Sequence, residues 1–84
     1  MLYISVFTFS PEKRELVIKR RRQEGAMSRG KILAEWITIG GGRIFGVVDV
    51  DNPSLMLQAV QAWSDLGQTE LIPIMTLEDA LQAI

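Results

Sequence analysis

The sequence predicts a single α+β domain with the element order β-α-β-β-α-β and a short helix at its end. Short runs rich in branched and aromatic residues alternate with two helix-like stretches, as that order requires. Two pairs typical of helix starts, Ser10-Pro11 and Asn52-Pro53, follow the first and third of these runs. A glycine segment at 40–42 joins the second run to the third, which is typical of a β-hairpin.

The first half of the chain predicts a strand and a highly charged helix. Residues 2–9 have the composition of a strand. The helix is expected over residues 11–24, because its acids lie near the start and its Lys and Arg toward the end, as the helix dipole favours. Gly25 is suited to end it. Only Val17 and Ile18 offer a shared apolar sector, so this helix should dock shallowly.

The hairpin and a second helix follow. Strands are predicted over residues 31–39 and 43–50, with the turn at 40–42 between them. Asn52 is suited to cap a helix over residues 53–66, which carries apolar residues at helical spacing.

The last part of the chain predicts an edge strand and a tail helix. Residues 69–75 form the strand, and Pro73 restricts it to a sheet edge or a bulge. Residues 76–79 resemble a capping box before a short amphipathic helix that ends at Ile84. With right-handed crossovers, the whole order gives one sheet with both main helices on one face, the ferredoxin-like plait.

Composition excludes several kinds of chemistry. The chain has no cysteine and no histidine, so it has no disulfides and lacks the usual ligands of zinc. Ser28 and Ser64 have no histidine partner, which excludes a Ser-His-Asp triad. We therefore expect no metal and no cofactor. A domain this small is marginal alone, and without disulfides or metals the remaining route to stability is oligomerisation.

Charge is divided unevenly along the chain. All nine Lys and Arg lie between Lys13 and Arg43, which gives the first half a net charge of +5 and the second half −6. Such asymmetry can mark a nucleic-acid patch, or two surfaces that attract each other. The net charge of −1 favours the second interpretation. No apolar run reaches the ~18 residues of a membrane span, and residues 1–9 do not resemble a signal peptide, so we expect a soluble cytoplasmic protein.

The strands are apolar on both faces, although helices cover only one. Strict alternation groups Ile32 with Ala34 and Trp36, against Leu33, Glu35 and Ile37. A sheet apolar on both sides must be covered on both. We therefore expect a second copy of the sheet, or a small apolar ligand, on the second face. The candidates for that dimer face or ligand cavity are Tyr3, Ser5, Phe7, Glu35, Trp36, Phe45, Val47 and Asp49.

Two alternatives remain open. The segment RIFGVVDV at 43–50 resembles the strand with which RNA-binding domains of this topology stack bases, and Tyr3 and Phe45 would serve there. Asp49 and the valine at position 47 depart from that pattern. Glu35 is the candidate general acid or base of an enzyme without a cofactor, since a strand carboxylate can acquire a raised pKa; pairing with an arginine is the commoner outcome.

Several motifs resemble one known family. They are the opening MLY, the helix LVIKRRRQEG, the hairpin containing W and IGGGR, the VDVDNP corner, AWSDLG and the final IPIM. Together they are similar to a prokaryotic family of small uncharacterised proteins, domain of unknown function 3303 (DUF3303), over essentially the whole chain. The resemblance implies a dimeric α+β barrel, in which two ferredoxin-like sheets pack open face to open face, and it implies no activity.

The functional expectation is a homodimeric ligand-binding or interaction module rather than an enzyme. A cofactor-free monooxygenase-like or isomerase-like enzyme is the first alternative, and it depends on analogy of fold alone. An RNA-binding module that uses the open face is the second alternative.

Overall fold

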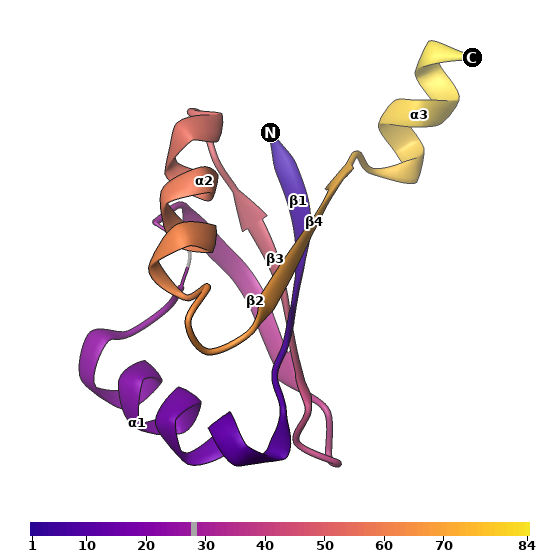
Figure 1. Cartoon of the computed structure of the whole chain (residues 1–84). Coiled ribbons are helices and arrows are strands. Elements are labelled where there is room, and N and C mark those ends of the chain that lie inside the picture. Colours follow the sequence, from indigo (N-terminus) through magenta and orange to yellow (C-terminus); the bar gives the residue numbers. More distant parts are fainter. Residues whose placement is uncertain (28) are drawn as a thin grey trace.

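The computed structural model describes residues 1–27 and 29–84, so Ser28 lies outside this part. The predicted order of elements is confirmed (Figure 1). The elements are β1 (Leu2–Thr8), a 3-10 turn η1 (Pro11–Lys13), α1 (Arg14–Glu24), β2 (Lys31–Ile37), β3 (Arg43–Asp49), α2 (Pro53–Ala62), β4 (Gln68–Ile74) and α3 (Leu77–Ala83).

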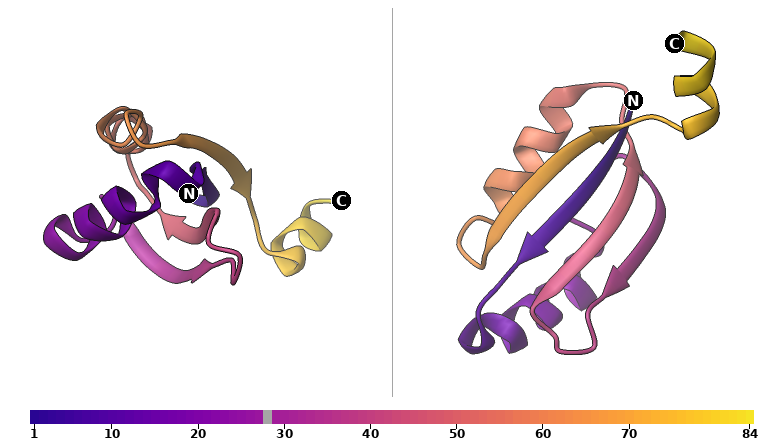
Figure 2. Two further views of the ribbon diagram at one scale, coloured as in Figure 1. Left: turned by 60° about the horizontal axis from the view of Figure 1, so that its bottom comes forward. Right: turned by 90° about the vertical axis from the view of Figure 1, so that its right-hand side faces the viewer.

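The four strands form one sheet in the order β2-β3-β1-β4, and every neighbouring pair is antiparallel. Helices α1 and α2 lie on the same side of the sheet (Figures 1 and 2). This is the ferredoxin-like plait that the sequence predicts. The strand that contains Pro73, β4, lies at an edge of the sheet, as expected for a proline.

The core lies between the helices and the covered face of the sheet. Phe7 of β1 is fully buried, and its ring meets Trp63 edge to face with centroids 5.9 Å apart. Val17, which is the buried residue of α1, packs into the same cluster. A second cluster joins β3 to α2 through Val48 and Met56. Docking of α1 through a single fully buried side chain agrees with its thin apolar content.

Helix ends follow local chemistry. Gly25 ends α1 with φ 79°, a left-handed conformation that glycine adopts without steric cost. The Asn52 side chain accepts a hydrogen bond from the backbone N–H of Ser54 and caps α2. However, α2 ends at Ala62, four residues before the predicted end, because the chain must turn there to bring β4 beside β1.

A β-bulge in β2 corrects the predicted faces of that strand. Ile32 lies opposite Val48, but Ala34 lies opposite Val47, so one extra residue is accommodated between them. The grouping of Ile32 with Ala34 and Trp36 was therefore wrong. Ile32 faces the helices, whereas Ala34 and Trp36 face the other side of the sheet.

Helix α3 stands apart from the rest of the domain (Figures 1 and 2). The Thr76 side chain accepts a hydrogen bond from the backbone N–H of Asp79, so the predicted cap is confirmed. The helix has no buried residue. Among the described helices, none combines the length and the apolar character that crossing a bilayer would require.

Candidate functional site

The sheet face opposite α1 and α2 carries a continuous apolar surface. The strand register aligns Trp36, Phe45 and Val6 in one row across the sheet, and Ala34, Val47, Ile4 and Ile72 in the next. Leu2 and Ile74 extend it toward the end where β4 finishes. We call this surface the open face, and it consists of Leu2, Ile4, Val6, Ala34, Trp36, Phe45, Val47, Ile72 and Ile74.

No described helix covers the open face. Trp36 is 59% exposed and Ile72 is 40% exposed. In an antiparallel sheet with one solvent-exposed face, the side chains on that face are normally polar. Here acidic side chains stand only at its margins: Asp49 beside Leu2, and Glu70 beside Val6. The open face is therefore more apolar than the exposed face of an antiparallel sheet normally is.

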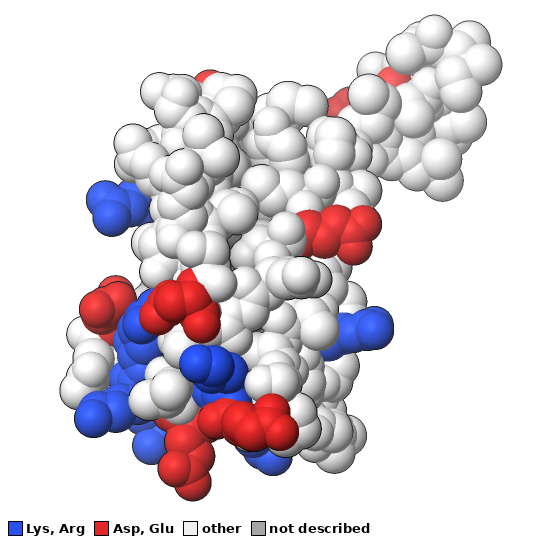
Figure 3. All heavy atoms as spheres, in the orientation of Figure 1, with Lys and Arg blue, Asp and Glu red and all other residues white. Residues whose placement is uncertain are grey.

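The charged side chains gather elsewhere. Figure 3 shows the blue and red side chains concentrated over α1, whereas the part of this view that contains α2, the strand ends and α3 is mainly white. A hollow of about 650 Å³ follows the outer side of α1. It is lined by Arg14, Glu15, Ile18, Lys19, Arg22 and Gln23, so it contains none of the predicted site residues.

Four of the eight predicted site residues do lie on the open face or its margin. Trp36 and Phe45 are cross-strand neighbours there, Val47 lies in the next row, and Asp49 lies at the margin. The Asp49 carboxylate accepts a hydrogen bond from the amine of Met1 at 3.0 Å.

The other four predicted residues lie on the helix-covered side, so the expectation of one shared surface was wrong. Phe7 is part of the core, and Tyr3 packs against the cluster around Val48. Ser5 borders a gap of only about 10 Å³ beneath α2, roughly the space of one water molecule and far below that of a ligand site. Alternation within β1 separates all three from Phe45, because Tyr3, Ser5 and Phe7 point to the opposite face from Ile4 and Val6.

Glu35 reaches the helix-covered side because of the bulge. Its carboxylate forms an ion pair with Arg21 of α1. The pair borders a hollow of about 250 Å³ that Trp36 and Ile44 also line. This volume lies just below the usual range for small-molecule sites, which begins near 300 Å³. The arginine pairing expected as the commoner outcome is the one observed.

A family comparison is decisive for this chain. Residues 1–84, its whole length, match the model described as Domain of unknown function (DUF3303). The chain belongs to the DUF3303 family. The family description assigns no activity, and neither the curated proteins nor the solved structures give a match.

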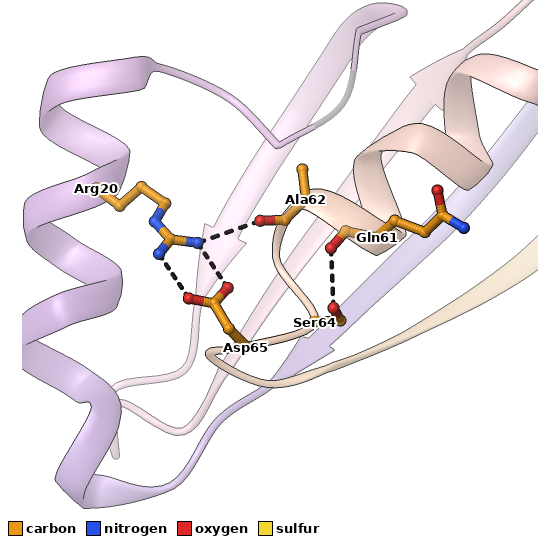
Figure 4. A network of polar contacts seen from close by, with 5 residues as sticks. All are labelled: Arg20, Gln61, Ala62, Ser64 and Asp65. Atoms are coloured by element: carbon orange, nitrogen blue, oxygen red, sulfur yellow. Dashed lines mark hydrogen bonds and ion pairs between the residues drawn. The ribbon is translucent and has the colours of Figure 1, made fainter.

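The AWSDLG segment of this DUF3303 chain forms the main polar contact between α1 and the turn after α2 (Figure 4). The Arg20 guanidinium donates to both oxygens of Asp65, at 2.8 and 2.7 Å, and to the carbonyl of Ala62 at 3.2 Å. It also lies 5.2 Å from the centre of the Trp63 ring. The hydrogen bond from Arg20 lowers the pKa of the Asp65 carboxyl, and the same bond raises the pKa of Arg20.

The sequence pattern gives no sign that Arg20 is the partner of Asp65. No spacing rule connects the two residues, because they are 45 positions apart. The contact has a structural role, because it holds α1 against the turn after α2. It lies on the side of the sheet away from the open face.

Proposed function

We propose that this DUF3303 protein acts as a homodimeric interaction module, in which two copies pack open face on open face to form an α+β barrel. The observation that carries the proposal is the open face itself, with apolar residues from all four strands and a tryptophan more than half exposed. The hydrophobic effect favours removing such a surface from water.

The size of the open face suits this role. Four strands about 4.8 Å apart and seven residues at about 3.3 Å each give that whole side of the sheet, polar ends included, a projected area of roughly 440 Å². A contiguous apolar patch that occupies much of such a side is often an interaction site. A second open face matches it in shape and chemistry, since stacked sheets of antiparallel strands pack through such apolar side chains.

The interior between two such faces would accept only a small apolar ligand. Base stacking is the competing use of the face, and the neighbouring rings of Trp36 and Phe45 favour it. Tyr3, however, lies on the covered side, and Asp49 and Glu70 would repel phosphates at the margins. Self-association therefore fits the surface better than RNA binding does.

Sedimentation equilibrium of the wild type and of two matched lysine variants tests the proposal. Ile72→Lys places a charge on the open face, and the control Leu57→Lys places one at a similarly exposed apolar position on α2. We expect dimers for the wild type and the control, and monomers with an unchanged circular dichroism spectrum for Ile72→Lys. A wild type that stays monomeric at high concentration would overturn the proposal, the more so if single-stranded RNA quenches its tryptophan fluorescence. Native mass spectrometry of the fresh dimer would reveal any retained apolar ligand.

A further inference from the structure

Helix α3 carries an apolar stripe that the rest of the described chain does not cover. Leu77, Leu81 and Ile84 follow at helical spacing, and they are 74%, 63% and 99% exposed. Met75, just before the helix, is also exposed. A stripe of this kind on a surface helix normally faces a core.

The helix is too short to be stable by itself. It has seven residues, whereas isolated helices shorter than about 12–15 residues are marginal in water. The Thr76 cap and the acidic residues Glu78 and Asp79 in the first turn favour it, but each such feature contributes little. An ordered α3 therefore requires a surface against which its stripe can pack.

The sheet of the same copy does not provide that surface. Only Met75 and Thr76 separate β4 from α3, and the helix continues outward past the end of the strand (Figures 1 and 2). In Figure 1, α3 lies to the right of the strands and α1 and α2 lie to the left, so α3 projects on the side of the open face. Ile74, the last residue of β4, belongs to that face, and the stripe begins at Leu77, directly after the two connecting residues.

The arm would also enlarge the area of the dimer. Specific interfaces bury about 800 Å² of accessible surface on each partner. The stripe is apolar surface that adjoins the open face, and it adds to what the sheet can bury. A partner copy stacked on the open face would lie where α3 projects.

We propose that α3 is an arm that packs its apolar stripe, Leu77, Leu81 and Ile84, against the second copy of the chain. This proposal depends on the proposed function, because it assigns a further contact to the same dimer. The two arms are related by the two-fold axis, and each packs on the other copy. They cover the strand ends that face-to-face stacking leaves exposed.

The first test compares two changes within the same helix of the full chain. Leu77→Lys combined with Leu81→Lys places charges on the stripe, and the control Gln82→Lys places one at an exposed polar position beside it. We expect the dimer dissociation constant to rise at least about tenfold for the double variant, since two buried leucines are lost from the interface. The control should match the wild type within about twofold.

The second test requires no variant. In a dimer mixed from 13C-labelled and unlabelled chains, isotope-filtered NOEs should connect the methyl groups of Leu77 and Leu81 to the other chain. Interchain NOEs together with the weaker dimer of the double variant would support the arm. Purely intrachain NOEs, or a double variant as tightly dimeric as wild type, would overturn the arm and leave the open-face dimer standing. A monomeric wild type would overturn both proposals.

Discussion

Arg20 and Asp65 are 45 positions apart in the chain, and their side chains meet through two parallel hydrogen bonds of 2.8 and 2.7 Å (Figure 4). Paired donors on a guanidinium match the two oxygens of a carboxylate in geometry as well as charge. The contact holds α1, whose only fully buried side chain is Val17, to the turn that follows α2. The position of this helix thus depends on one buried apolar side chain, Val17, and on one ion pair, Arg20 with Asp65.

Replacing Asp65 by Asn should lower the melting temperature at neutral pH, because Arg20 loses its ionised partner. The folded-state pKa of Asp65 lies below its ordinary 3.8, so the stabilisation is present above that value and is lost as the pH falls through the lowered pKa. The difference in melting temperature between wild type and variant should therefore shrink in strongly acidic solution. Thermal melts at both pH values check this, with Asp51→Asn, in an exposed loop, as the control. A constant difference would contradict the ionic origin of the effect.

Replacing either of two phenylalanines by Ala should have effects of different kinds. Phe7→Ala creates a cavity beside Trp63 and should reduce the free energy of unfolding by about 3–5 kcal/mol. Phe45→Ala removes a ring from the open face, so it should chiefly weaken association. Urea unfolding at several protein concentrations separates the two, since only a weakened dimer shifts its midpoint strongly with dilution. If the effect of Phe45→Ala on the urea midpoint were the same at every protein concentration, that result would argue against the open-face dimer.

Gly67 lies where a side chain has no room. An added Cβ would stand 2.3 Å from the carbonyl oxygen of Thr8 and 2.8 Å from the Phe7 ring. Gly67→Ala should therefore cost more than about 1 kcal/mol of stability, despite the lower entropy of the unfolded variant. The matched control is Gly40→Ala, because an added Cβ at that position meets no atom within 4 Å. Urea unfolding measures the free energy of unfolding of both variants. Equal values would show that the backbone of β1 can shift at Thr8 at little energetic cost.

Removing the cap of α3 should melt that helix without unfolding the domain. Thr76→Ala deletes the acceptor of the Asp79 N–H, and loss of such a cap costs about 1 kcal/mol. Backbone chemical shifts of residues 77–83 should move toward random-coil values, while those of the sheet stay unchanged. Gln82→Ala, at an exposed position in the same helix, should leave the helical shifts in place. Unchanged shifts in the Thr76 variant would show that packing alone maintains α3.

The sequence predicts most of the fold because its local signals agree with one another. Asn52, Thr76 and Gly25 each mark a helix end by a chemistry that operates within a few residues. The edge position of β4 follows from Pro73 in the same way. These features need no knowledge of the tertiary structure.

The site was less predictable, since it depends on which face of each strand meets the helices. Both faces of β1 are apolar, so alternation could not decide between Tyr3 and Ile4. The bulge after Ile32 shifts the rest of β2 by one residue, and no glycine or proline marks it. Glu35 and Trp36 consequently exchange the faces that strict alternation from Ile32 assigns to them.

The two edge strands of the sheet, β2 and β4, affect how many copies of the chain could associate. The interruption in β2 and the proline in β4 discourage another strand from adding at either margin. Addition of further copies at the sheet edges could continue without limit, as in a filament. Pairing through one self-complementary surface buries that surface, so the assembly stops at two copies. The bulge that made β2 hard to predict from its sequence would thus, together with Pro73, keep the proposed assembly at two copies.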